Sequence, residues 1–311
     1  MSVFTVVTDA ALSDWLKQYN LQLVAFQGIA AGVTNTNYFV DTQHGRYVLT
    51  LFETLRLDEL PFYLELMSHL ARHGVACPAP LLDQQDRLAS MLAGRPACLV
   101  SCLTGRDIET PNPAQCRAVG DMLATLHRAA GTFKLSTVNP RGPAWWSQAA
   151  PTLYPLLTSA EAASLREEIA FQASHRTSHL PRGVIHADLF KDNVLMAGDA
   201  IAGFIDFYYA CNDVLLYDVA IAVNDWARRP DGQIDPALAR AFLAGYQAVR
   251  PLEAAERELW PVMLRAAALR FWVSRLLDLH FPMEGALTYT KDPGVFHTLL
   301  AAHRARQDFW L

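Results

Sequence analysis

The sequence has few cysteines and no long apolar run, and each shortage narrows the possible functions. The five cysteines are odd in number and scattered, with neither a C-x-x-C pair nor a histidine cluster at zinc spacing. We therefore expect reduced thiols and neither a disulfide framework nor a zinc site. The richest apolar stretch, 214–223, is interrupted by Asp218 and is much shorter than the roughly 18 residues that a membrane span needs.

Charged residues are also scarce, at 18% of the chain, and the net charge is −5. Without a basic run, this balance does not favour a nucleic-acid or anionic membrane surface. The first residues lack a basic region and reach Asp9 early, which argues against a signal peptide. We expect a cytoplasmic protein that acts on small molecules, with neither nucleic acid nor a membrane as a partner. The sequence does not predict its oligomeric state.

The length of 311 residues and the hydrophobic content of 52% allow two domains with sizeable cores. Alternating apolar patterns predict β-hairpins over 24–51 and 88–103, with a helix over 60–73 between them. Beyond residue 105 the pattern is mainly helical. We predict an α+β fold with a small, antiparallel, β-rich N-terminal lobe over 1–101. A larger, mainly helical C-terminal lobe would follow over 102–311.

The most informative segment lies between short apolar strands and reads His186-Ala-Asp188, with Asn193 five residues after the aspartate. Asp206 follows at the end of the next apolar strand. This spacing is typical of phosphoryl transfer from ATP. Asp188 would accept or orient the proton of the acceptor hydroxyl, and His186 would hold the loop in shape. Asn193 and Asp206 would supply the hard oxygen ligands that Mg²⁺ prefers. Turn chemistry alone also places Asp and Asn in loops, but the flanking strands favour the catalytic interpretation.

The connection between the first two strands is rich in glycine and short polar residues. Glycine lets a backbone approach anionic oxygens, and polar side chains add hydrogen bonds, so we predict a flap over phosphates; an ordinary turn is the alternative. A later extended segment would offer backbone groups to the adenine edge, or would be a plain core strand. The candidate nucleotide-binding residues are Gly28, Gly32, Thr34, Asn35, Asn37, Val100, Cys102 and, in the catalytic loop, Lys191.

Thr50 occupies the strand position at which a V-A-I-K pattern would carry a phosphate-binding lysine. Glu65, on the helix over 60–73, therefore lacks its expected lysine partner and fits a surface acid equally well. Positive charge near the phosphates would come from Lys191 instead, although loop lysines are often simply solvated.

A helix predicted over 262–280 is apolar around most of its circumference yet carries Arg265, Arg270 and Arg275. A buried guanidinium needs a carboxylate, either from the protein or from a ligand. If an arginine and an acid face one cleft, they could bind the carboxylate and the ammonium group of a zwitterionic substrate. The alternative is that the arginines and acids form ion pairs with one another inside the protein. Asp225 is the leading acid, with Asp213 and Asp218 behind it. The candidate substrate-binding residues are Asp225, Arg275, Arg270, Asp213 and Trp226.

The strings His186-x-Asp188-x-x-x-x-Asn193 and Ile205-Asp206-Phe207 resemble the aminoglycoside phosphotransferase and choline kinase superfamily. Strings around Asn224 and Arg270 extend the resemblance to its bacterial homoserine kinase family. The resemblance implies a protein-kinase-like bilobal fold, ATP and Mg²⁺, and transfer of the γ-phosphate to the hydroxyl of L-homoserine in threonine biosynthesis. A kinase of another small alcohol, such as choline or an aminoglycoside, and a non-catalytic nucleotide-binding module are the alternatives.

Overall fold

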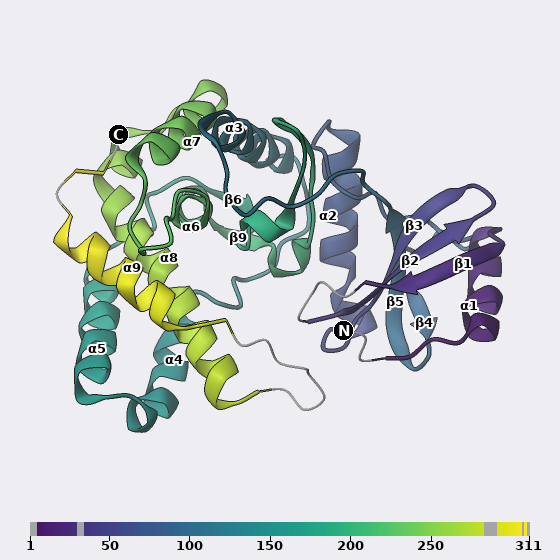
Figure 1. The fold of residues 1–311 in the computed structure, drawn as a ribbon, viewed down its shortest axis with the longest axis horizontal. Helices are drawn as coiled ribbons and strands as arrows, with labels where there is room; N and C mark the ends of the chain where they lie inside the picture. The colour runs from purple at the N-terminus through teal and green to yellow at the C-terminus, as the bar shows by residue number, and fades with distance from the viewer. Residues whose placement is uncertain (1–4, 30–33, 283–290, 307, 310–311) are drawn as a thin grey trace. The chain divides into compact units, whose positions relative to one another are not determined.

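The computed structural model describes residues 5–29, 34–282, 291–306 and 308–309. These residues form two compact units (Figure 1). Unit 1 contains the described residues up to Thr104, and unit 2 begins at Gly105. The last strand of unit 1 ends at Ser101. The sequence predicts a lobe boundary after residue 101, at the end of this strand, whereas the compact unit extends to Thr104. The exact boundary between the lobes stays a prediction.

Unit 1 is built on a five-stranded antiparallel sheet with the strand order β1-β2-β3-β5-β4. Alternate side chains of β2 are buried, as expected for a strand with one face on a core. The turn to β3 uses Gly45 at a φ of +126°, which residues with a Cβ rarely adopt. The strands are β1 (Leu23–Gly28), β2 (Thr36–Thr42), β3 (Gly45–Leu51), β4 (Ser90–Leu92) and β5 (Arg95–Ser101).

Two α-helices accompany this sheet in unit 1. The first is capped by Thr8, whose hydroxyl accepts a hydrogen bond from the Ala11 N–H. It is fastened to β4, because the indole N–H of Trp15 donates to the Ser90 hydroxyl at 2.8 Å. The second begins with Pro61, whose fixed φ suits a first helical turn. The helices are α1 (Asp9–Leu16) and α2 (Pro61–Arg72).

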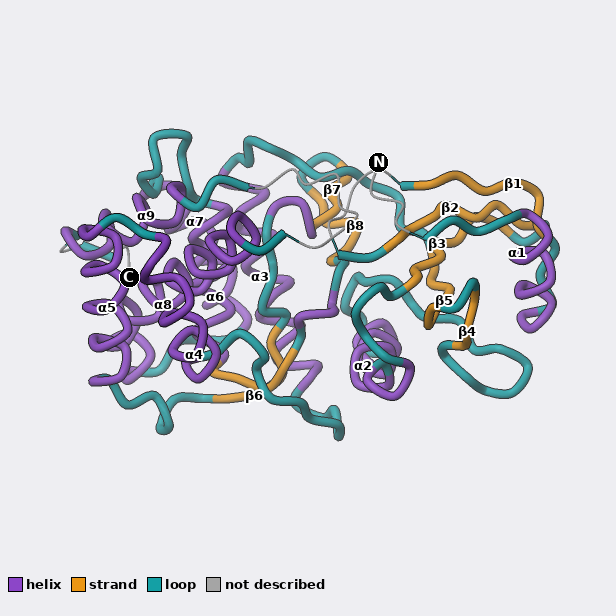
Figure 2. The backbone as a smooth tube through the Cα atoms, turned by 90° about the horizontal axis from the view of Figure 1, so that it is seen from below, coloured by secondary structure: helices purple, strands orange, loops and turns teal. Residues whose placement is uncertain are grey.

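Helices make up most of the described part of unit 2, as Figure 2 shows. Thr158 and Glu161 form the reciprocal cap that their spacing predicts, since each side chain accepts the other residue's backbone N–H. Asp235 caps a later helix through the Ala237 N–H at 2.8 Å. The helices are α3 (Pro113–Ala130), α4 (Pro143–Leu153), α5 (Ser159–Ser174), α6 (Leu215–Trp226), α7 (Pro236–Val249), α8 (Ala254–His280) and α9 (Gly294–Ala305).

Helices α3 and α7 approach one another at two glycines. A Cβ at Gly120 would collide with the Phe242 carbonyl, and a Cβ at Gly245 would collide with the Arg117 carbonyl. The two backbones therefore touch without intervening side chains, which close packing permits only where both contact positions are glycine.

Helices α6 and α8 carry much of the buried core of unit 2. Every residue of α6 is buried, and α8 buries Trp260 and Trp272. The buried helix predicted over 262–280 is confirmed, and it extends further at its N-terminal end. Arg265 on this helix forms an ion pair with Glu168 at 2.7 Å, so this arginine has a protein partner.

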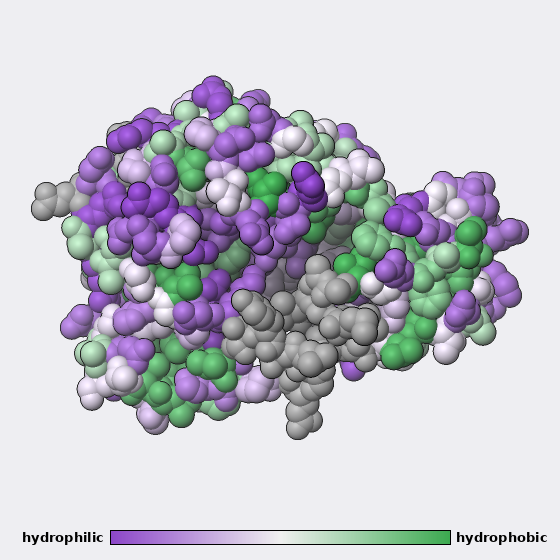
Figure 3. Space-filling model, in the orientation of Figure 1, coloured by the Kyte–Doolittle hydropathy of each residue, from purple (hydrophilic) through white to green (hydrophobic). Residues whose placement is uncertain are grey.

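In the ranges that the structure describes, no helix is long and apolar enough to cross a membrane. On the face of unit 2 visible in Figure 3, hydrophilic and hydrophobic side chains are intermingled.

Two short antiparallel strand pairs in unit 2 hold the predicted catalytic loop. The first pair ends directly before His186, and the second begins directly after Asn193. Phe204 ends the strand that leads to Asp206. The strands are β6 (Arg182–Ile185) paired with β9 (Cys211–Val214), and β7 (Val194–Ala197) paired with β8 (Ala200–Phe204).

Candidate active site

The catalytic loop begins with a left-handed backbone conformation at Ala187, whose φ is +62°. This region is costly for a residue with a Cβ and persists only where the surroundings impose it. Here Asp218 of α6 imposes it: its two carboxylate oxygens accept the backbone N–H groups of His186 and Ala187, both at 2.7 Å. A side chain 32 residues away from His186 thus fixes the start of the loop.

Asp218 is completely buried and is held ionised by its donors. His127 donates to it at 3.1 Å, and the other ring nitrogen of His127 lies 2.8 Å from the Tyr246 hydroxyl. Burial acts to raise the pKa of Asp218, but the bonds from His127 and His186 outweigh it and hold that pKa below its usual value. The sequence carried a signal for this role, because Asp218 is the acid that interrupts the apolar run 214–223.

His186 links the loop to the strand that precedes Asp206. Its Nε2–H donates to the Ile205 carbonyl at 3.0 Å, and its Nδ1 accepts the Asp188 N–H at 3.3 Å. Burial lowers the pKa of His186, which favours the neutral ring that this pattern requires. These contacts support the predicted role of His186 in holding the loop.

Asp188 presents a carboxylate that is held from two sides. Asn193 donates its side-chain N–H to the Asp188 main-chain oxygen at 2.8 Å and to Oδ2 at 3.2 Å. On the other side, the Arg270 guanidinium lies 3.9 Å from Oδ1 and donates to the Ala187 carbonyl. Burial raises the pKa of Asp188 to about 7; Arg270 opposes this shift, and Asp206 adds to it. A carboxylate with such a pKa is suited to accept a proton near neutral pH.

Asn193 and Asp206 offer oxygens of the kind that a hard cation binds. Because the Asn193 side-chain N–H donates to Asp188, its amide oxygen is the atom that could serve as a metal ligand. Burial raises the pKa of Asp206 to about 6, although the Tyr208 backbone N–H opposes the shift. A bound cation would favour the ionised carboxylate and so lower the pKa of Asp206 again. Among the described residues, no group of three His, Cys, Asp or Glu side chains is placed to hold a metal, so a cation here would need further ligands such as phosphates.

Comparison with known proteins places this loop in a family. Residues 25–252 match the family described as "Phosphotransferase enzyme family". Homoserine kinase of Neisseria meningitidis serogroup B is 53% identical over 301 residues, covering 96% of this chain and 99% of that protein. Homoserine kinase of Methylobacillus flagellatus is 52% identical, covering 96% and 94%. The chain belongs to the homoserine kinases, within the phosphotransferase enzyme family.

Solved structures of this kinase group share the fold. An amicoumacin kinase in complex with AMP-PNP and Ca²⁺ is similar with a TM-score of 0.71 at 16% identity, covering 95% of this chain and 91% of that chain. Choline kinase from Cryptosporidium parvum gives a TM-score of 0.62 at 13% identity, covering 90% and 88%. The predicted α+β, protein-kinase-like fold, with an antiparallel sheet followed by a helical part, is thereby confirmed.

In this homoserine kinase family member, the predicted substrate residue Asp225 contacts the catalytic loop, and Arg275 lies on the buried helix α8. Asp225, at the end of α6, accepts the Lys191 backbone N–H at 2.9 Å and lies 3.5 Å from Arg228. Arg275 is 9% exposed and donates to the main-chain oxygen of Asp292 at 2.9 Å.

The other predicted substrate residues have different surroundings. Asp213 on β9 forms an ion pair with Arg182 at 2.8 Å and accepts the Asn139 side-chain N–H at 2.6 Å. Trp226 is fully buried. Arg270 is 3% exposed, and its hydrogen bond goes to the catalytic loop. Their substrate roles stay predictions: Trp226 and Arg270 are more deeply buried than Arg275, and Asp213 is paired with Arg182.

The predicted nucleotide-binding residues of unit 1 lie on its sheet, except Gly32, which falls outside the described residues. Asn37 of β2 accepts the Thr50 hydroxyl at 2.7 Å, so the residue at the expected lysine position bonds across the two strands. Asn35, just before β2, is buried at 7% exposure. Gly28 ends β1, and Thr34 is half-buried.

The segment predicted to face adenine contains the end of β5. Val100 is buried there, and the neighbouring backbone already pairs with residues 79–81. Cys102 follows the strand and is partly exposed. Glu65 is exposed on α2, as a surface acid would be. In unit 2, Lys191 donates from its ammonium group to the Glu109 carbonyl at 3.1 Å.

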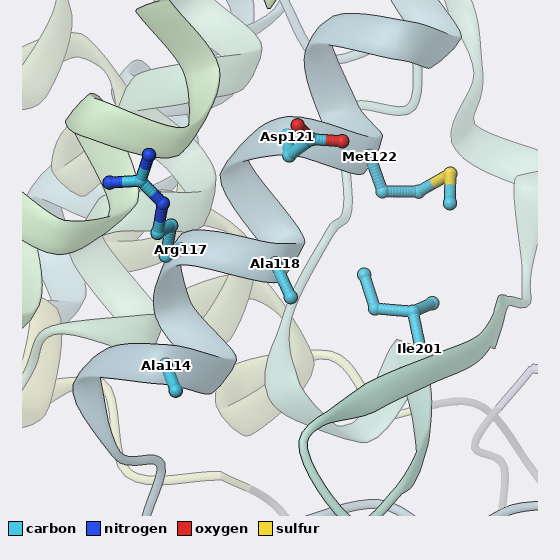
Figure 4. A pocket seen from close by; sticks show the side chains of 6 residues that line it. All are labelled: Ala114, Arg117, Ala118, Asp121, Met122 and Ile201. Atoms are coloured by element: carbon cyan, nitrogen blue, oxygen red, sulfur yellow. The ribbon is translucent and has the colours of Figure 1, made fainter. Parts of the chain in front are cut away.

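A shallow depression of about 400 Å³ lies elsewhere in unit 2, between α3 and β8. Figure 4 shows Met122 and Ile201 pointing into the same space, whereas the Arg117 guanidinium points away from Ile201. None of the predicted site residues lines it, so volume alone would not identify the catalytic loop. Its lining residues are Ala114, Arg117, Ala118, Asp121, Met122 and Ile201.

Proposed function

We propose that this protein transfers the γ-phosphate of ATP to the hydroxyl of L-homoserine, giving O-phospho-L-homoserine and ADP in threonine biosynthesis. One observation carries the proposal: homoserine kinases at 53% and 52% identity match nearly the full chain. The hydrogen bonds that hold Asp188 and Asn193 together in the catalytic loop of unit 2 support this proposal.

Asp188 acts as the base. The substrate oxygen attacks the γ-phosphorus while the bond from that phosphorus to the bridging oxygen of ADP breaks, and the hydroxyl proton moves to Asp188. The bonds from Asn193 fix the direction of this carboxylate, and its raised pKa brings its affinity for a proton near the working range. His186 and Asp218 hold the backbone on which Asp188 is placed.

Mg²⁺ is the cofactor that fits Asn193 and Asp206, because both offer hard oxygens and a cation would offset the desolvation that raises the pKa of Asp206. When bound, the ion would neutralise charge on the phosphates. The two side chains orient the ligand oxygens: Asn193 through its bonds to Asp188, and Asp206 through its backbone at a φ of +61°.

The nucleotide contacts proposed for unit 1 come from the glycine-rich connection and the end of β5. Gly28, Gly32, Thr34, Asn35 and Asn37 would approach the phosphates, while Val100 and Cys102 would line the adenine site. Lys191 of the catalytic loop is the proposed cation for phosphate in unit 2. The bond between Thr50 and Asn37 supports a strand on which no lysine serves this purpose.

We place the activity in the cytoplasm, where ATP is supplied. None of the five cysteines, all of which lie in the described ranges, is in a disulfide, and four of them are buried, which agrees with a reducing compartment.

The test is a coupled assay of ADP formation with homoserine, serine, threonine, choline and kanamycin as acceptors. Homoserine should give the highest kcat/KM, and mass spectrometry should identify O-phosphohomoserine. Asp188→Asn should keep the fold and lose activity by about 10²- to 10⁴-fold, the usual weight of a positioned base. A higher kcat/KM with choline or kanamycin than with homoserine would show that the enzyme has a different substrate. Absence of turnover with every acceptor would favour a non-catalytic nucleotide-binding module.

A further inference from the structure

Two arginines of unit 2 lie near one another in largely buried positions. Arg228 follows α6 and its side chain is 20% exposed, while Arg275 of α8 is 9% exposed. Burial lowers the pKa of Arg275, and the nearby guanidinium of Arg228 lowers it further, whereas the carboxylates of three surrounding acids oppose the shift; these acids are Asp225, Asp292 and Asp192. Two buried like charges destabilise one another unless an anion lies between them.

The protein itself satisfies these guanidiniums only in part. Arg275 donates to a neutral main-chain oxygen, that of Asp292, at 2.9 Å. Arg228 reaches the Asp225 carboxylate at 3.5 Å, and its buried Nε has no hydrogen-bond partner within the described part of the chain. Since each guanidinium carries five N–H donors, charged donors outnumber the acceptors around them.

The neighbouring acids are engaged with other groups. Asp225 accepts the Lys191 N–H at 2.9 Å, and Asp292 accepts the Gly294 N–H at 2.8 Å. Asp192 forms an ion pair with Lys291 at 2.8 Å. Across the described ranges, no carboxylate is within ion-pair distance of both Arg228 and Arg275.

This arginine pair is connected to the catalytic loop. Asp225 contacts Arg228 with one carboxylate oxygen and the backbone of Lys191 with the other. Asp192, next in the loop, forms an ion pair with Lys291 at 2.8 Å, and the main-chain oxygen of the adjacent residue Asp292 accepts the Arg275 N–H at 2.9 Å. A short substrate whose hydroxyl meets Asp188 could therefore direct its other end toward the arginines.

We propose that Arg228 and Arg275 together bind the α-carboxylate of the amino-acid substrate and so select substrates that carry one. This inference rests on the proposed function and names the residues that give it specificity. Two guanidiniums suit a carboxylate because each can direct two parallel N–H groups at it. Arg270, the other arginine expected here, has its hydrogen bond committed to the Ala187 carbonyl.

The experiment compares L-homoserine with L-homoserine amide, which has the same shape but no carboxylate charge. With the unmodified enzyme, we expect kcat/KM to be about 100-fold lower or more for the amide, because the charged donors would be left unpaired. Arg228→Met and Arg275→Met should lose a similar factor with homoserine. They should change by less than about threefold with the amide, since its recognition no longer depends on the arginines.

Matched controls come from two exposed arginines. Arg229→Met removes the arginine next to Arg228 in the chain; Arg229 itself pairs with Asp231. Arg257→Met removes a charge from the start of α8. Both should keep the preference for homoserine over the amide. Arg275→Lys, which keeps the charge, should recover part of the activity with homoserine, and thermal unfolding should show that each variant is folded.

Several results would overturn the inference. Equal turnover of homoserine and its amide by the unmodified enzyme would exclude a carboxylate site without any variant. Arginine variants that lose both substrates equally would show a structural ion network in place of a binding pair. In either case the enzyme would still phosphorylate homoserine, so the proposed function would stand. An unmodified enzyme that does not phosphorylate homoserine would overturn both.

Discussion

Replacing Asp218 with asparagine should destabilise unit 2 and displace Asp188, the proposed catalytic base, in the same variant. The carboxylate accepts the N–H groups of His186 and Ala187 with its two oxygens and also receives the His127 ring. Asparagine keeps one oxygen and places an N–H₂ group where the second oxygen was. Two donors would then face one another in a fully buried position.

The magnitude follows from these contacts. One buried N–H left without an acceptor costs about 1–3 kcal/mol, and a lost hydrogen bond to a charged group costs about 1.5–3 kcal/mol. Removing a buried charge returns part of its desolvation cost. We therefore expect the free energy of unfolding to fall by about 2–4 kcal/mol, a large part of the roughly 5–15 kcal/mol typical of a folded protein. Ala187 would then leave its left-handed conformation, and kcat would fall by about 10²-fold or more as Asp188 moved.

The assay combines urea unfolding, followed by far-ultraviolet circular dichroism, with kcat at saturating ATP and homoserine. Measurements are made at a temperature at which the variant is folded. Asp231→Asn serves as the control, because Asp231 is 58% exposed and its ion pair with Arg229 contributes little. It should stay within about 0.5 kcal/mol of the original protein. A loss below about 1 kcal/mol in Asp218→Asn, or a kcat within threefold, would refute the reasoning.

Three further predictions concern the metal site, a buried histidine and a helix contact. Asn193→Ala should weaken Mg²⁺-dependent activity and be partly rescued by more Mg²⁺, whereas Asp188→Asn should not; equal responses in a Mg²⁺ titration would contradict the separate roles. Burial lowers the pKa of His303 to about 3, so the unfolded chain binds a proton that the folded chain does not, and stability should fall as the pH drops below about 6.5. By pH 5 the loss should be about 2 kcal/mol at most, and His303→Gln should remove it in urea unfolding at pH 7.5 and pH 5; an unchanged pH dependence would exclude this origin. Gly245→Ala should cost about 1–3 kcal/mol or more, because its Cβ meets the Arg117 carbonyl, and an unchanged thermal midpoint would contradict the close helix contact.

Buried polar positions were harder to interpret from sequence than exposed motifs. The sequence makes Asp218 a candidate substrate ligand, but in the structure it is fully buried and accepts N–H groups of the catalytic loop. Arg270 is a candidate for the substrate carboxylate, and its described contacts are with Ala187 and Asp188. A sequence shows that such a charge needs a partner, yet protein and ligand partners satisfy the same requirement.

Features that depend on short-range spacing could be predicted from the order of residues alone. The interval from His186 to Asn193 defined the catalytic loop, and the pair Thr158 and Glu161 marked a helix start, because backbone geometry fixes how residues a few positions apart can meet. Alternating and helical apolar patterns likewise predicted the sheet of unit 1 and the buried helix over 262–280.

The contacts between side chains that are far apart in the chain became visible only in the folded molecule. Asp218 reaches Ala187 across 31 positions, and Arg270 reaches it across 83. The contact of Asp225 with Lys191 spans 34 positions, and it ties the proposed carboxylate site to the catalytic loop. These pairings depend on how α6 and α8 pack to bury their apolar faces, and that packing is a property of the whole core and not of any local run of residues.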